Sequence, residues 1–331
     1  MKGKIVMNPV LLERCELLLR NREAMRVAFP WDAGKIHVCC AALYTMRGRE
    51  ADPASVKASL ALLKQRMGAF SEFRGTARNV LVCLMELSGD PQDMLERAAQ
   101  VYALLRQGFF SSAYLPVAAM TIAQHAQPVR YAELAHRTRA LYERMRKEHP
   151  FLTSSEDTGL CALLALSQEE DEVLLSRMEE AYTVLRQRFS YANAVQSLSH
   201  VLTLLPGDTK EKCARLADCY DAFRMNGNRW GRDYELPVLG VLCEDPRPFS
   251  DLVQETVACS DYLKGRKGFG FFSDITRPQR LMFAGLLTRQ NDPAAATATI
   301  NSTLAAIIAE HAAVCCCVTA SAAAANAASH A

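Results

Sequence analysis

Two polar stretches of the chain have the residue types and spacing that could do chemistry. Asn193, Gln196 and His200 are spaced by three and four residues, which places them on one face of a helix that is otherwise apolar. The second stretch runs from His149 to Asp157 and joins two successive units of a sequence repeat that is described below. A histidine near a carboxylate and two amides can bind a metal ion, transfer a proton or hold a polar ligand. The candidate ligand-binding residues are His149, Thr153, Asp157, Asn193, Gln196 and His200.

The same row has a purely structural interpretation. Asn and Gln at the interface between stacked helices commonly satisfy exposed backbone groups, and His200 can pair with Ser199 or with a carbonyl. A ligand site requires that Asn193, Gln196 and His200 face an inner groove with solvent access. Complete burial would favour a buried hydrogen-bond ladder instead.

Two basic segments are weaker candidates for anion binding. Lys264, Arg266 and Lys267 lie among glycines and aromatic residues in an expected connecting loop, where backbone amides could hold a phosphate. No strand precedes this segment and its glycine spacing matches neither common nucleotide-binding pattern, so a plain connector is the alternative. Arg74 and Arg78 are one helical turn apart beside a glycine and could grip an anion.

No established catalytic signature accompanies these candidates. The chain contains no H-E-x-x-H, G-x-S-x-G or Walker sequence, and none of its 12 cysteines forms a C-x-x-C pair. We therefore expect no cofactor, and the sequence specifies no metal. The amino terminus lacks the apolar core of a secretory signal, and scattered cysteines on apolar stretches are typical of buried thiols in a reducing cytoplasm.

The elements that must position these residues are marked by a tyrosine that recurs about every forty residues. The positions are Tyr102, Tyr142, Tyr182, Tyr220 and Tyr262. A bulky residue often follows seven positions later, as Phe109 and Phe189 do, and we expect this pair to pack neighbouring units together. A period of this length is typical of stacked helical repeats.

We therefore predict an all-α fold, namely a right-handed α-solenoid of about six to seven helix-pair repeats resembling HEAT or armadillo proteins. Residues 1–320 would form one domain, with a capping helix over 9–28, helix pairs over 36–290 and an alanine- and cysteine-rich helix over 294–320. Residues 321–331 would be a frayed tail. Capping aspartates followed by proline, at Asp52-Pro53 and Asp90-Pro91, mark helix starts.

Composition narrows the choice of partners. Hydrophobic residues make up 50% of the chain and charged residues 22%, which is ordinary for a soluble globular protein. The net charge of +2 gives no general electrostatic attraction to nucleic acid, so we expect no nucleic-acid partner. Polar residues interrupt the apolar tail, so we expect no membrane partner either. The sequence leaves the oligomeric state open.

The polar stretches resemble a known family. His149-Pro150-Phe151-Leu152-Thr153 with Asp157, and Asn193 with Gln196, Leu198, Ser199 and His200, are similar to the best-marked segments of the bacterial domain-of-unknown-function family 4003. The similarity extends from about residue 10 to the carboxyl-terminal tail. Ala192 stands where that family often has a glycine. The resemblance implies a bacterial protein, mainly of Firmicutes, and supplies no activity, cofactor or partner.

Two hypotheses follow. The first is an uncharacterised cytoplasmic binding or scaffold module whose curved surface takes a protein, a peptide or a small polar ligand. The second is an enzyme or metal-binding protein that uses Asp157 and His200, with His149 as a further candidate. The second requires side-chain oxygen and nitrogen atoms to converge within about 3 Å of one another or of a shared point.

Overall fold

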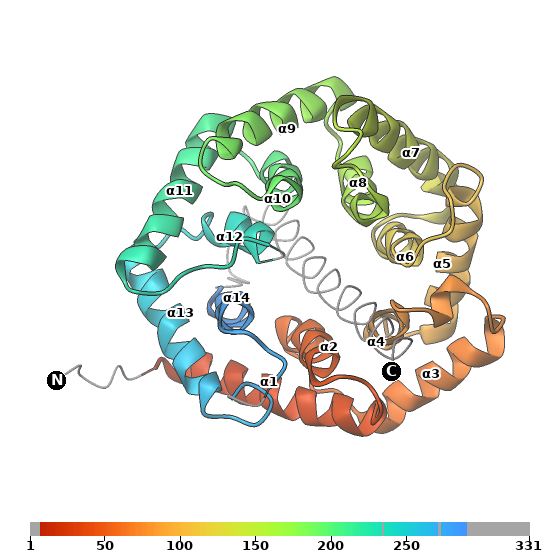
Figure 1. Ribbon diagram of the computed structural model, residues 1–331. Helices are drawn as coiled ribbons and strands as arrows, with labels where there is room; N and C mark the ends of the chain where they lie inside the picture. Colours follow the sequence, from red (N-terminus) through yellow and green to blue (C-terminus); the bar gives the residue numbers. More distant parts are fainter. Residues whose placement is uncertain (1–6, 234, 271–272, 290–331) are drawn as a thin grey trace, which may run out of the picture.

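The computed structural model is all-helical in the residues that it describes, which are 7–233, 235–270 and 273–289. No strand occurs in these three ranges. Within these ranges, fourteen α-helices alternate between an outer and an inner layer (Figure 1). The outer helices are α1 (Pro9–Ala28), α3 (Pro53–Arg66), α5 (Pro91–Leu105), α7 (Tyr131–Glu148), α9 (Asp171–Arg186), α11 (Thr209–Met225) and α13 (Phe249–Lys264). The inner helices are α2 (Gly34–Met46), α4 (Arg78–Leu87), α6 (Leu115–His125), α8 (Thr158–Leu166), α10 (Ala192–Leu204), α12 (Leu236–Leu242) and α14 (Arg277–Thr288).

The hydrophobic pattern decides which layer a helix joins. In α8 every residue from Thr158 to Ala165 is buried, as expected for a helix that is apolar on all sides. In α5 the buried residues recur at spacings of three and four, from Met94 to Leu105, so only one stripe faces the core. Apolar helices therefore form the inner layer and amphipathic helices cover them.

The array closes into a ring (Figure 1). Helix α1 packs against α13 and α14, and α14 packs against α2. Arg14 of α1 donates to the backbone oxygens of Leu287 (3.0 Å) and Arg289 (2.7 Å). The expected array with two capped ends is thus not what the structure shows. The first and last pairs cover each other's apolar faces, so α1 is one of the ring's outer helices instead of a terminal cap. The expected helix over 294–320 and tail over 321–331 lie outside the described residues.

The expected tyrosine contacts are present, and they connect successive units. Tyr142 packs edge-to-face on Phe109, with ring centroids 5.1 Å apart, and Tyr220 packs on Phe189 at the same distance. Phe109 lies beyond the end of α5, in the connection to α6. The aromatic partner of Tyr142 therefore comes from the connection of the preceding unit and not from α7, the helix that contains Tyr142. These contacts fix each connection against the next outer helix.

The two ends of the ring differ. The connections from outer to inner helices all lie at one end, which we call the loop face; they span 29–33, 67–77, 106–114, 149–157, 187–191, 226–235 and 265–276. Two of them include short 3₁₀ helices, η1 (Glu72–Arg74) and η3 (Ser155–Asp157), and a third, η2 (Pro128–Arg130), lies on the opposite face. The connections on the opposite face have three to six residues, compared with five to twelve on the loop face. The loop face therefore has most of the irregular backbone from which a site can be built.

On the opposite face, cations of the outer helices bind the carboxyl-terminal carbonyls of the inner helices. Arg137 of α7 donates to Ala165 O (3.0 Å) at the end of α8 and pairs with Asp171 (2.7 Å). Lys212 of α11 is buried and donates to Leu205 O (2.7 Å) beyond α10. Both contacts satisfy carbonyls that a helix end leaves unpaired. These cations of the opposite face therefore serve to stabilise the fold.

Candidate functional site

The segment between α7 and α8 is held in place by its own hydrogen bonds. Ser154 Oγ accepts from Glu156 N (3.2 Å), and Asp157 accepts from Ser154 N (2.8 Å), which together form a capping box before α8. Thr158 Oγ1 donates to Ser155 O (2.7 Å). These hydrogen bonds therefore hold the segment in one conformation and fix the positions of the side chains on both of its sides.

One contact between the two sequence-predicted polar stretches forms on the inner side of this segment. Gln196 Nε2 of α10 donates to Thr153 Oγ1 at 3.0 Å, and both residues are buried. The two polar stretches singled out from the sequence are thus brought together. Gln196 Oε1 is buried and has no hydrogen-bond partner within the described ranges.

His200 lies one helical turn beyond Gln196 and is completely buried. Neither ring nitrogen has a hydrogen-bond partner among the residues described. Burial, followed by the charge of His149, lowers the pKa of His200 to about 3, so its imidazole is neutral at physiological pH. Burial raises the pKa of Asp157 to about 7, although its hydrogen bond from Ser154 N acts in the opposite direction.

The remaining candidates of this group lie elsewhere. His149 Nε2 lies 2.7 Å from Glu179 Oε2, and its ring stacks at a tilt on Tyr182 with centroids 4.7 Å apart. Asn193 is exposed. No hydrogen bond or ion pair found in the described part of the chain joins Asp157 to His200. The expectation of solvent access was wrong for Gln196 and His200, because the polar face of α10 packs inside the inner layer.

The basic candidates do not gather into one anion site. Arg78 pairs with Asp32 (3.1 Å), and Arg74 donates to Met67 O (3.4 Å). Arg266 pairs with Glu16 at 3.3 Å, while Lys264 and Lys267 lie on either side of it in an exposed stretch at the end of α13. The charge of each arginine is thus committed to a structural contact nearby.

Two searches for other sites within the described residues gave negative results. No group of three or more His, Cys, Asp or Glu side chains is placed to hold a metal ion in ranges 7–233, 235–270 and 273–289. Over the same residues, none of the helices has the length and apolar character needed to cross a membrane.

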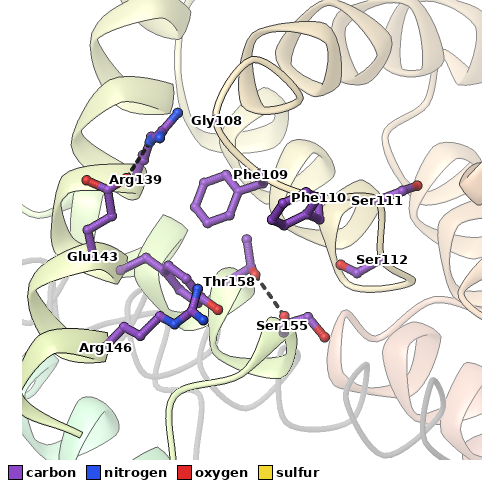
Figure 2. A pocket seen from close by; sticks show the side chains of 11 residues that line it. Gly108, Phe109, Phe110, Ser111, Ser112, Arg139, Glu143, Arg146, Ser155 and Thr158 are labelled. Carbon is purple, nitrogen blue, oxygen red and sulfur yellow. Dashed lines mark hydrogen bonds and ion pairs between the residues drawn. The ribbon is translucent and has the colours of Figure 1, made fainter. Parts of the chain in front are cut away.

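A cavity of about 340 Å³ opens on the outer side of the 149–157 segment (Figure 2). Its walls come from the α5–α6 connection, from α7 and from the start of α8. Figure 2 shows the charged side chains of α7 on one side and Phe110 and Ser112 on the other. The lining residues are Gly108, Phe109, Phe110, Ser111, Ser112, Arg139, Tyr142, Glu143, Arg146, Ser155 and Thr158.

Only some of the charged side chains in this cavity are paired with a group of opposite charge. Arg139 Nε donates to Glu143 Oε1 (2.6 Å), so these two groups offset each other. Arg139 crosses the α carbon of Gly108, where a Cβ would lie 2.3 Å from Nη1; a glycine is needed for this approach. Arg146 makes no ion pair or side-chain hydrogen bond within the described chain, and Figure 2 shows it reaching toward Thr158 and Ser155. The cavity therefore contains one unneutralised cation.

A second cavity, of about 380 Å³, lies between α7 and α9 and includes His149. Arg144 pairs with Glu172 (2.6 Å) and His149 with Glu179, and the remaining charged residues of the lining, Lys147 and Glu148, have opposite signs, so this lining has no excess of cations. It offers less to a ligand than the first cavity does.

Sequence reasoning found the segment but not the cavity. Ser155 belongs to the polar stretch that was singled out and Thr158 directly follows it, whereas Arg139 and Arg146 had no motif to mark them. The detectable signal was Gly108 directly before two phenylalanines, since a glycine at that point permits a close approach.

Fold and site together define a closed ring of seven helix pairs in the described part of the chain, with a small, positively charged cavity on its loop face. The chain belongs to the family described as "Protein of unknown function (DUF4003)", whose model matches residues 21–313. It is similar to an uncharacterised protein, YeaA, of Bacillus subtilis strain 168, with 24% identity over 289 residues that cover 80% of this chain and 86% of the relative. No solved structure matches the chain significantly. The resemblance noted in the polar stretches is thereby confirmed.

Proposed function

We propose that this protein is a binding module that takes a small anionic ligand with a flat apolar body in the loop-face cavity. The single observation behind the proposal is Arg146, whose guanidinium lines the cavity without an ion pair among the described residues. Arginine is well suited to carboxylates and phosphates because its planar fork donates two parallel hydrogen bonds.

The uncharged lining favours the rest of such a ligand. Phe109 and Tyr142 form an edge-to-face pair on one wall, and aromatic walls favour flat apolar groups. Hydroxyls of Ser112 and Ser155 lie on the lining and can orient an acidic group. A volume of about 340 Å³ is at the lower end of small-molecule sites, which suits one ring with one acidic group.

The alternative of an enzyme or metal-binding protein gains no support from these contacts. His200 is neutral and enclosed, and Asp157 accepts its hydrogen bond from Ser154 within its own capping box. A cytoplasmic location remains part of the proposal, because buried thiols such as Cys161 and Cys243 suit a reducing compartment.

The test uses thermal unfolding of the purified full chain with small probes. Benzoate and phenyl phosphate should raise the unfolding midpoint, because a ligand that binds only the folded state stabilises it. Benzyl alcohol and benzylammonium, which keep the ring and change the charge, should have little effect. Inorganic phosphate alone should bind more weakly than phenyl phosphate.

Two variants on one helix sharpen the result. Arg146→Ala should abolish the stabilisation by benzoate. Arg144→Ala removes a neighbouring cation that is already paired with Glu172, and it should leave the response intact. If neutral and anionic probes stabilise equally, if neither aromatic anion stabilises, or if Arg146→Ala responds like the original protein, the proposal is wrong.

A further inference from the structure

The four most exposed apolar side chains among the described residues are not scattered. Trp31, Phe70, Phe110 and Phe151 each lie in a different connection of the loop face, and the least exposed of them, Phe110, is 91% exposed. Tyr191 occupies the next connection and is 56% exposed. We call these five residues the loop-tip aromatics. They follow one another at intervals of 39 to 41 residues, so successive units present one each.

Full exposure of a large ring in water is unfavourable, and a folded protein normally covers it. Each loop-tip aromatic has a close aromatic neighbour in its connection that is packed, as Phe109 is beside Phe110. Packing of the first ring holds the connection still, so the second is presented to solvent at a fixed place. The repetition in five connections indicates that these separate rings share one role on the loop face.

The loop face also carries an excess of positive charge. Last turns of the outer helices contribute eight lysines and arginines: Arg26, Lys64, Arg66, Arg146, Lys147, Arg186, Arg224 and Lys264. The same turns contain only two carboxylates, Glu148 and Asp261. The seven connections themselves contain equal numbers of acidic and basic residues, so the excess belongs to the face as a whole.

We propose that the loop face docks on an anionic lipid bilayer, with the loop-tip aromatics entering the interface and the last-turn cations meeting acidic headgroups. Aromatic rings are favoured at the level of lipid headgroups, and juxtamembrane cations are attracted to anionic lipid. A bilayer receives separate protruding rings without needing a matching surface. A second copy of the chain is a poorer occupant, because two faces with the same positive excess repel each other.

This mode of binding requires no spanning helix. The sequence led us to expect no membrane partner because it lacks a convincing apolar span, but a protein that lies on a membrane is recognised by exposed aromatics and cations on one face. That combination becomes visible only when the connections are assembled around the ring.

The chain contains its own reporter for the test. Of its two tryptophans, Trp31 is 97% exposed at the loop face and Trp230 is buried. Vesicles of phosphatidylcholine with about one third phosphatidylserine should therefore shift Trp31 emission to shorter wavelength and should sediment the protein. Vesicles of phosphatidylcholine alone should bind it at least about ten-fold more weakly at low salt, and added salt should weaken binding to the anionic vesicles.

Matched variants separate docking from folding. The triple variant Trp31→Ser, Phe70→Ser and Phe151→Ser removes three rings that make little contact in the folded chain, so its unfolding midpoint should stay the same. Its binding to the anionic vesicles should fall at least about ten-fold, because each ring can bury a large apolar area. Val129→Ser removes an 89% exposed side chain on the opposite face and should bind as the original protein does.

Four results would overturn the proposal: no sedimentation with anionic vesicles, equal binding to neutral vesicles, undiminished binding of the triple variant, or a dimer that the triple variant abolishes while vesicle binding is absent. The last result would identify a second copy as the occupant. Arg146 is unchanged in every variant and no small aromatic anion is present, so this test does not depend on the cavity proposal.

Discussion

Asp157 and His200 are two buried ionisable groups whose pKa values are displaced in opposite directions. His200 has a folded-state pKa of about 3, below its unfolded value of about 6.5, so acidification in that window protonates the unfolded chain first and stability falls. Asp157 has a folded-state pKa of about 7, above its unfolded value of about 3.9. Its folded form therefore binds the proton first, and stability rises as the pH falls through that window. Between about pH 6.5 and pH 4 the two contributions oppose each other.

The variant Asp157→Asn should remove this cancellation. Each group changes the free energy of unfolding by about 1.4 kcal/mol per pH unit in the shared window. From about pH 6.5 to about pH 4.5 the variant should lose about 2 kcal/mol relative to the original protein, because each group titrates at less than the full slope near pH 6.5. His200→Gln should gain about 2 kcal/mol relative to the original protein over the same interval, because only the carboxyl group then titrates.

Urea unfolding followed by circular dichroism at several pH values measures both effects. The quantity to compare is the difference in unfolding free energy between variant and original protein at each pH, since exposed carboxylates contribute equally to both and cancel. A difference that stays constant with pH for Asp157→Asn would refute the reasoning. Differences of the same sign for the two variants would refute it as well.

Three further predictions concern the ring. Arg137→Ala should cost about 2–3 kcal/mol of unfolding free energy in urea, because it frees carbonyls at the end of α8, whereas Arg144→Ala, at a partly exposed ion pair, should have a much smaller effect. Gly285→Ala should lower stability by about 1–3 kcal/mol, since its Cβ would lie 2.6 Å from Leu242 Cδ1 and 3.0 Å from the Trp230 ring. The nine cysteines of the described residues should resist maleimide until the chain unfolds, as peptide mass spectrometry would show, because all are buried.

Local signals located most helices from the sequence. Helix α1 spans the residues 9–28 that were predicted for the first helix, and the aspartates before Pro53 and Pro91 accept backbone hydrogen bonds as N-caps should. Gly89 has the left-handed conformation expected after a helix, with φ of +87°. Such features depend on neighbouring residues only, so one sequence contains enough to place them.

The closure of the array into a ring could not be predicted from such local signals. The tyrosine period gives the length of a unit but not the angle between units, and that angle decides whether the array stays open or returns to its start. The decisive contacts, such as Arg14 with Leu287 and Cys15 with Cys259 (sulfurs 3.2 Å apart), join residues more than 240 positions apart. Nothing in the local pattern distinguishes Arg14 from any other exposed helix cation.

The candidate site was predicted only in part, because its contacts also join residues of different units. Spacing placed Gln196 and His200 on one face of α10 correctly, but a shared face does not reveal what covers it. Here Thr153 of the preceding unit binds Gln196, and the row is buried. The cavity depends on Arg139 crossing Gly108, a contact between units that no spacing within one helix could indicate.

The repeat period of the aromatic residues does not show which of them are packed and which are exposed. Two rings occur close together in several connections, such as Phe109 with Phe110 and Phe189 with Tyr191, and the sequence alone does not say which one packs. In the structure Phe109 and Phe189 meet the tyrosines, while Phe110 and Tyr191 remain exposed. The packed ring is needed to hold the connection, but stability gives no reason to keep a ring in water at the same place in five successive units. That repeated cost is the strongest sign that the loop face is a binding surface.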